Sequence, residues 1–331
     1  MARALRIWLM LALLALVALA IALAVGSRAI APIELLRAVF VPDGGIATQV
    51  VHELRLPRAL AAFATGGLLA VAGAWMQVLL RNPLADPYVM GASGGAAVGA
   101  LAAMLFGVGG ALIQGAAFGG ALASTALVFA LARREFAGAA LSDPGLGAPR
   151  LLLAGVMLAA LWTALVTLLL TLSPEARIRG MLFWLAGDVS AGRGGGPALA
   201  LLIVMVIAAW PLGRSLNALL RGPVTALALG VRVTALRRTL FVLASLATAV
   251  AMTTSGAVGF VGLVVPHALR LAIGNDQRVL LPACALGGGA LLVLADTLAR
   301  TVVAPQQLPV GLVTALLGVP SFLLLLLGRA R

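Results

Sequence analysis

The stretch that decides the fold is RLPRALAAFATGGLLAVAGAWMQVLLRNPLADPYVMGASGGAAVG, residues 55–99. Its first half holds about twenty apolar and small residues in a row, enough to cross a bilayer core roughly 30 Å thick. The run breaks at Arg81, Asn82 and Pro83, and after Pro87 it resumes as a second apolar run rich in glycine and alanine. Because lipid cannot satisfy free backbone groups, such a polar break must face water or lie buried in protein. The stretch therefore predicts a membrane helix, a structured break and a second, closely packed helix.

The same order of elements occurs again later in the chain. The stretch SGAVGFVGLVVPHALR, residues 255–270, lies between two further apolar runs. With the N-terminus inside, the first copy begins at the outer face of the membrane and the second at the inner face. Repeats that begin on opposite faces are inverted repeats, a common transporter architecture with the transport path at their interface. Small residues that favour close helix packing are Gly66, Gly67, Gly73, Gly91, Gly95, Gly99, Gly115, Gly119, Gly256, Gly259 and Gly262.

Composition indicates the class of protein. The 331 residues are 63% hydrophobic and only 10% charged, and the mean hydropathy is +1.14, whereas a soluble chain is about a quarter charged. We therefore predict an all-α polytopic transmembrane bundle of about ten spans, forming a single permease domain over residues 1–331. The expected spans are residues 7–25, 60–80, 88–106, 111–132, 150–172, 198–212, 240–254, 258–273, 279–298 and 309–327.

The basic residues indicate topology rather than a nucleic-acid partner. The formal charge is +13, and all 23 basic residues are arginine, with no lysine. Arginines that flank membrane helices mark the cytoplasmic side. With the N-terminus inside, fifteen of the 23 fall on that side, which predicts that both termini are cytoplasmic. The eight outer arginines are an excess that topology does not explain.

The chain lacks the residues that would energise transport. A phosphate-binding Walker loop needs a lysine, so this chain cannot hydrolyse ATP by that route. Its acidic residues fall at or near span ends, whereas ion-coupled carriers usually bury a carboxylate in mid-membrane. His267 is the ionisable group nearest a mid-span position, where we expect a structural hydrogen bond rather than a proton relay. With one cysteine, Cys284, and no catalytic or metal-binding pattern, we predict no catalytic residue, metal or cofactor.

Six motifs carry a family resemblance. In chain order they resemble the FecCD-like permease family of type II ABC importers for iron–siderophores, haem and vitamin B12. That resemblance implies a homodimer of ten-span subunits in the lipid of a bacterial inner membrane, two separate cytoplasmic ATPase subunits and a soluble substrate-binding protein outside. It makes the chain a permease subunit rather than an enzyme. The motifs are RLPR (55–58), RNPLADPYVMGASGG (81–95), LNALLRGPVTALALG (216–230), SGAVGFVGLVVPHALR (255–270), ADTLAR (295–300) and QLPVGLVTALLGVPSFLLLL (307–326).

The resemblance gives roles to two sets of residues. Arg55, Arg58 and Arg300 match outer arginines that meet acidic knobs on the binding protein, the alternative being solvated helix-end arginines. Two positions depart from the family pattern: Pro223 stands where an acidic residue is frequent, and Gln307 where Glu is common. The segment that matches the cytoplasmic coupling helices, which sit in a groove of the ATPase, includes Asn217, Gly222, Pro223, Leu229 and Gly230.

The substrate is inferred from a polar interval after the fifth span. Arg177 and Arg179 precede Trp184 there, and an arginine near the path could guide the propionates of haem. We therefore expect haem ahead of a ferric siderophore, with cobalamin third; alternatively, both arginines only cap a surface helix. Arg179, Trp184 and Gln77 are the candidate path residues, although a polar side chain in a span more often satisfies neighbouring backbone. A secondary transporter is a more remote alternative, which a stable complex with a separate ATPase would exclude.

Overall fold

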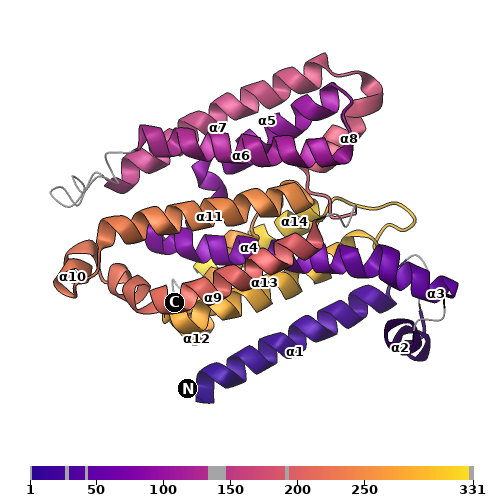
Figure 1. Cartoon of the computed structure of the whole chain (residues 1–331), viewed down its shortest axis with the longest axis horizontal. Helices are drawn as coiled ribbons and strands as arrows, with labels where there is room; N and C mark the ends of the chain where they lie inside the picture. The colour runs from indigo at the N-terminus through magenta and orange to yellow at the C-terminus, as the bar shows by residue number, and fades with distance from the viewer. Residues whose placement is uncertain (1, 27–29, 42–43, 133–146, 191–193, 328–331) are drawn as a thin grey trace.

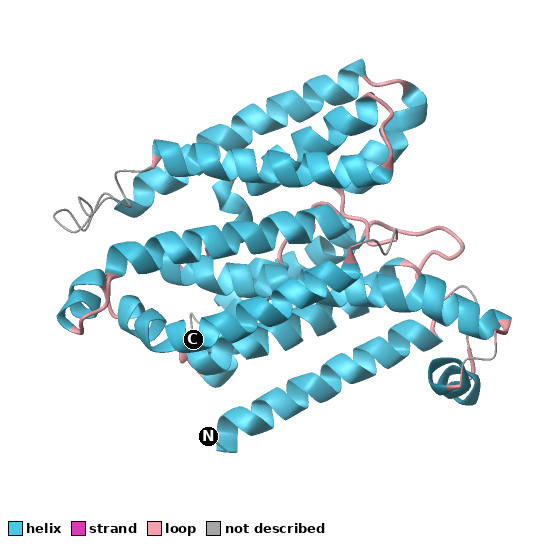
Figure 2. Cartoon of the chain, viewed as in Figure 1, coloured by secondary structure: helices cyan, strands magenta, loops and turns pink. Residues whose placement is uncertain are grey.

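The computed structural model describes residues 2–26, 30–41, 44–132, 147–190 and 194–327, and in this part of the chain helices joined by loops are the only regular structure, with no strand (Figure 2). The predicted all-α fold is confirmed. The helices are α1 (Ala2–Ala24), α2 (Pro32–Phe40), α3 (Ile46–Gln49), η1 (Val50–Arg55), α4 (Leu56–Leu79), η2 (Pro87–Met90), α5 (Ala92–Leu105), α6 (Gly110–Leu131), α7 (Gly147–Leu172), α8 (Glu175–Leu185), α9 (Gly195–Leu220), α10 (Pro223–Ala228), α11 (Val233–Ser255), α12 (Val261–Ile273), α13 (Gln277–Ala299) and α14 (Val310–Leu327).

The helices reproduce the predicted spans. Within the described residues, seven helical segments are long and apolar enough to cross a membrane, and α5, α12 and α14 are shorter apolar helices at the three remaining predicted positions. Two spans were predicted too short. Helix α9 continues past Pro211 to Leu220, and α11 begins at Val233 rather than near residue 240. A proline does not end a membrane helix when neighbouring helices and local adjustments re-satisfy the freed backbone.

Helix α4, from the opening stretch, is the centre of the bundle (Figure 1). Every residue from Gly66 to Leu79 is buried, and the helix packs against α9, α11, α12 and α13. A helix that is apolar on all sides belongs inside a protein core. The stretch at residues 55–99 therefore organises the tertiary structure as well as the sequence pattern.

Glycines allow the closest helix contacts. A Cβ atom on Gly73 would overlap the backbone of Gly262 in α12, and one on Gly66 would overlap the backbone of Gly288 in α13. Helices α5 and α6 meet in the same way at Gly95 and Gly120. The predicted role of small residues is confirmed at these positions. It is wrong within this chain for Gly115, Gly119 and Gly259, because a Cβ atom there would meet nothing within 4 Å.

The bundle has two distinct ends (Figure 1). The start of α1 and helix α10 lie at one end, which we call the α10 end. Helices α2, α3 and α8 lie at the opposite end, which we call the α8 end. Helix α4 follows η1 and runs away from the α8 end, whereas α11 follows α10 and runs toward it. The two helix–break–helix units therefore run in opposite directions, as inverted repeats do.

Candidate functional site

The breaks of the two repeats contact each other inside the protein. The Tyr88 hydroxyl of the first break donates to the Val258 carbonyl oxygen (2.9 Å) and accepts from the Val258 backbone N–H (3.0 Å) in the second. Helices α5 and α12, which follow the breaks, contain 14 and 13 residues. Such helices are only about 20 Å long, shorter than a bilayer core. Each break is therefore held by protein rather than exposed to lipid.

The first break is also fixed to neighbouring elements. The Ser124 hydroxyl of α6 donates to the Gly91 carbonyl oxygen (2.8 Å), and the indole N–H of Trp162 in α7 donates to the Ser124 oxygen (2.8 Å). The Asp86 carboxylate accepts from the Tyr88 backbone N–H (2.8 Å) and caps η2. Desolvation by the surrounding groups raises the pKa of Asp86 to about 6, although the Tyr88 bond opposes this. Hydrogen bonds to α6 and to the second break therefore fix the conformation of the first break.

We expect Tyr88→Phe to lower the free energy of unfolding by about 1–3 kcal/mol, because the buried backbone polar groups of Val258 lose their partner. The melting temperature of the purified protein in detergent measures this. Thr167→Val is the control, since the exposed Thr167 hydroxyl donates to the Thr163 carbonyl oxygen of its own helix. Equal melting temperatures for wild type, Tyr88→Phe and the control would contradict a structural role for this contact.

Arg58, a predicted docking residue, binds two side chains of the same chain. Its Nε and Nη2 atoms donate to the two carboxylate oxygens of Asp296 in α13, at 2.9 and 2.8 Å, and Nη1 donates to Gln307 Oε1 at 2.8 Å. Asp296 is only 3% exposed. This bidentate geometry is the strong form of an arginine–carboxylate pair. Gln307, one of the two departures from the family pattern, is thus an uncharged acceptor for the same arginine.

The other two predicted docking residues bind the end of α1. Arg55 Nη1 donates to the carbonyl oxygens of Leu23 (2.6 Å) and Ala24 (2.9 Å), and Arg300 Nη2 donates to that of Ala22. Helix α1 has no basic residue in its last turn, so these arginines supply the favourable positive charge at its C-terminus. The structure therefore gathers all three arginines at the α8 end, with partners inside the chain. Docking stays a prediction.

The predicted coupling segment forms a short exposed helix at the α10 end. Gly222 and Gly230 flank α10 with φ values of +114° and +78°, which favour glycine at both positions. Pro223 occupies the first turn of α10, where its missing N–H costs nothing. Val224 is 68% exposed and Leu229 is 63% exposed. The segment presents apolar side chains beyond the ends of the spans, as a helix that enters a partner's groove would.

Asn217, the first residue of the predicted coupling segment, lies on a spanning helix. It belongs to the last turns of α9 and not to the separate short helix. Its Nδ2 donates to Asp276 Oδ1 (2.8 Å), and its Oδ1 accepts from the Gln277 backbone N–H (2.9 Å). The Arg278 hydrogen bond, with further help from Asn217, holds the pKa of Asp276 below its usual range. Asn217 thus ties the helix that leads into α10 to the start of α13.

The three predicted path residues do not lie together. Arg179 and Trp184 are on α8, at the α8 end, and Arg179 is exposed with no hydrogen bond to a described residue. Gln77 is near the end of α4, is 2% exposed and donates to the Leu263 carbonyl oxygen of α12 (3.3 Å). Gln77 therefore satisfies neighbouring backbone, the commoner alternative. Arg177 faces α5, where its Nη1 donates to the Leu105 carbonyl oxygen.

The remaining predictions concern metals and polar side chains in spans. Among the described residues, no group of three or more His, Cys, Asp and Glu side chains could hold a metal ion. The ring of His267 lies edge-on to Phe322 of α14, with ring centres 5.5 Å apart. His267 therefore packs against an aromatic ring of the neighbouring helix.

Sequence reasoning missed three partners that fix this arrangement: Asp296 for Arg58, Val258 for Tyr88, and Asp276 for Asn217. The signal for Asp296 was a lone carboxylate close to an apolar run, since such residues are usually paired. The local pattern could not identify its partner, Arg58, which lies 238 positions earlier.

Comparison with known proteins gives a consistent result. The FecCD transport family model matches residues 13–328. The chain is 43% identical to the cobalamin import system permease protein BtuC of Halobacterium salinarum over 286 residues, covering 86% of this chain and 74% of the relative. It is 38% identical to the vitamin B12 import system permease protein BtuC of Escherichia coli over 330 residues, covering 98% and 96% of the two chains.

Solved structures share the fold. A structure described as an inward-facing conformation of a metal-chelate type ABC transporter matches 98% of this chain and 99% of its own, with a TM-score of 0.82 and 28% identity. PsaBC from Streptococcus pneumoniae matches 81% of this chain with a TM-score of 0.57, and at 18% identity it supports the fold alone.

Proposed function

The chain belongs to the FecCD transport family and is the multi-pass permease subunit of an ABC importer; from this premise we propose that its cargo is a cobalamin. The observation that carries the proposal is the nearly full-length similarity to the Escherichia coli vitamin B12 permease. The Halobacterium salinarum relative, at 43% identity, is also a cobalamin import permease by name. Haem, which the sequence analysis put first, becomes the second candidate.

The arginines that suggested haem support it less than expected. The Arg177 guanidinium bonds the end of α5, and so it serves the packing of α8 rather than a ligand. Arg179 is exposed on α8 and makes no hydrogen bond to a described residue, and it is the observation that keeps an anionic chelate, haem or a ferric siderophore, as a candidate. A neutral or zwitterionic corrinoid needs no arginine at the path.

The partners follow from the family. An ABC importer permease works with an ATPase and a binding protein, and we assign the ATPase to the α10 end and the binding protein to the α8 end. The exposed apolar face of α10 supports the first assignment, and the cluster of Arg55, Arg58 and Arg300 supports the second. We further propose a homodimer with two ATPase subunits, a single permease domain over the chain, and cytoplasmic termini in a bacterial inner membrane.

Docking at the arginine cluster requires an exchange of partners. Arg58 already binds the Asp296 carboxylate, so an acidic group of the binding protein must compete with Asp296 or add to it. An arginine can serve two acceptors because its guanidinium carries five N–H donors. The internal pair keeps the guanidinium oriented toward the incoming carboxylate until docking occurs.

A reconstituted transport assay tests the proposed cargo. Proteoliposomes that contain the permease, its ATPase and its binding protein should take up cobalamin with ATP, and haem and a ferric siderophore much more slowly. Arg179→Ala should leave cobalamin uptake unchanged, because a corrinoid does not need the guanidinium. Haem uptake that exceeds cobalamin uptake and falls in Arg179→Ala would support the second candidate instead. ATP-independent uptake by the permease alone would contradict the importer mechanism.

A further inference from the structure

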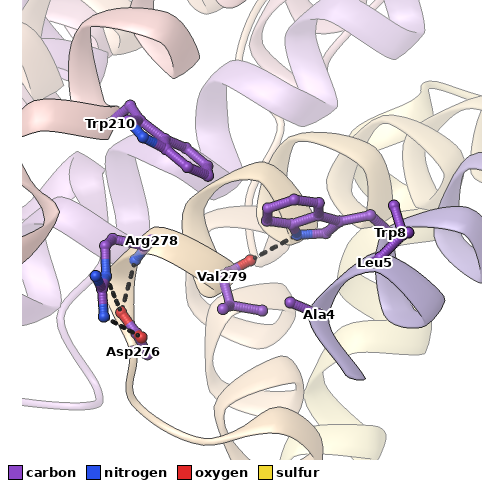
Figure 3. Close-up of a pocket in the computed structure, with 7 residues that line it drawn as sticks. All are labelled: Ala4, Leu5, Trp8, Trp210, Asp276, Arg278 and Val279. Atoms are coloured by element: carbon purple, nitrogen blue, oxygen red, sulfur yellow. Dashed lines mark hydrogen bonds and ion pairs between the residues drawn. The ribbon is translucent and has the colours of Figure 1, made fainter. Parts of the chain in front are cut away.

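A cleft of about 450 Å³ opens at the α10 end of the bundle, and the residues that line it are drawn in Figure 3. It lies between the first turns of α1, the second half of α9 and the start of α13. The ion pair of Asp276 and Arg278 stands at one side, and the other walls are apolar or aromatic. Its lining residues are Ala4, Leu5, Trp8, Trp210, Asp276, Arg278 and Val279.

Two tryptophans place this cleft at the membrane–water interface. Trp8 lies two turns into α1, and its indole N–H donates to the Val279 carbonyl oxygen (3.1 Å). Its ring centre is 5.9 Å from that of Trp210 in α9. The Trp210 side chain is half exposed. Tryptophan is enriched where headgroups meet acyl chains. The three helices around the cleft all belong to candidate membrane-spanning segments, so the apolar side of the cleft lies at a depth where lipid acyl chains begin.

The polar side of the cleft suits an anionic group. Arg278 uses Nε and Nη2 for Asp276, whereas its Nη1 makes no hydrogen bond to a described residue. Helices α1 and α13 both begin here, and helix N-termini favour negative charge. Arg214 is exposed one turn after Trp210, on the same face of α9. Positive charge near a headgroup layer attracts anionic lipids.

We propose that this cleft binds one anionic phospholipid, with its phosphate against Arg278 and Arg214 and an acyl chain packed along the contacting rings of Trp8 and Trp210. A zwitterionic boundary lipid would fill the apolar side equally well but would gain less from the two arginines. The site adjoins the coupling segment, because the Asp276 carboxylate that pairs with Arg278 also accepts from Asn217. A bound headgroup therefore contacts the network that fixes the end of α9 before α10.

Quenching of tryptophan fluorescence by brominated lipid tests the site. The full-length protein is reconstituted in phosphatidylcholine vesicles that hold a small fraction of brominated phosphatidylglycerol or brominated phosphatidylcholine. The difference between wild type and Trp8→Phe/Trp210→Phe isolates the signal from the cleft. We expect brominated phosphatidylglycerol to occupy the cleft about fivefold more readily for each arginine that contacts it. Arg214→Gln and Arg278→Gln should each reduce that preference.

Arg232→Gln is the matched control. Arg232 is exposed just before α11 at the same end of the bundle, and it lines neither this cleft nor the neighbouring polar cleft that shares Asp276 and Arg278 with it. Its substitution makes the same charge change and should leave the preference intact. Equal quenching of wild type by the two brominated lipids would overturn the proposal, since it indicates ordinary boundary lipid. An equal loss of preference in Arg232→Gln would also overturn it, because the preference would then come from the net positive charge of this end and not from the cleft. If Arg278→Gln does not fold, Arg214→Gln and the wild-type comparison still decide the outcome.

Discussion

Arg58→Ala is expected to lower the free energy of unfolding by about 3–5 kcal/mol, because it leaves the Asp296 carboxylate charged, buried and unpaired. Asp296 is 3% exposed and both of its oxygens accept from Arg58. Thermal unfolding in detergent, followed at one fixed scan rate, measures the loss. A melting temperature within error of wild type would show that Asp296 does not depend on this arginine.

The double variant Arg58→Ala/Asp296→Asn separates stability from docking. Removing the carboxylate charge together with its partner should recover most of the stability, since a buried pair can be replaced at little net cost. The docking proposal expects that this stable variant still captures less binding protein than wild type. If it captures the binding protein normally, Arg58 serves only the fold, and the docking role falls to Arg55 and Arg300 or to neither. Replacing all three arginines by glutamate would not make this distinction, because a glutamate at position 58 would also repel Asp296.

The largest functional effect is expected at α10. Val224→Glu/Leu229→Glu should leave the permease folded, because both side chains are mostly exposed. It should weaken the ATPase complex by about 2–4 kcal/mol, the size of effect seen when a central side chain of an interface is lost. Co-purification of the ATPase and ATP-driven uptake in liposomes measure the loss. Both should fall together, and the melting temperature of the permease alone should not.

Val302→Glu is the control for this experiment. Val302 is 68% exposed, like Val224, and it follows Arg300 at the α8 end of the bundle. The same substitution there should leave ATPase binding unchanged. Equal loss of the ATPase in both variants would mean that added charge harms the complex wherever it is placed. Normal ATPase binding by the α10 variant would remove the coupling role from this helix.

The similarity to the family includes every segment that these variants change. The match covers residues 13–328, so it includes the arginine cluster, both breaks and α10. Docking and coupling are tested with partner proteins, whereas the lipid cleft is tested on the permease alone. Failure of the importer assignment and failure of the lipid site would therefore be distinguishable.

The sequence by itself determined the class, the spans and the family. Long apolar runs are local properties of a chain, because a helix satisfies its own backbone and needs only about twenty residues to cross lipid. The absence of lysine excluded a Walker loop for the same local reason. The span end at residue 212 and the span start at residue 240 were misplaced, because a helix packed in a bundle tolerates polar and proline residues that would end an isolated one.

Only the tertiary structure decided which polar groups are paired. Arg58 and Asp296 are 238 positions apart, and Tyr88 and Val258 are 170 apart. No periodicity connects such positions, because each pair is set by how α4 packs against α12 and α13 through their glycines. In a low-dielectric interior, a buried charge or backbone group must find a partner wherever packing provides one. The arginines that looked like a free outer rim became anchors for α1 and α13 for that reason.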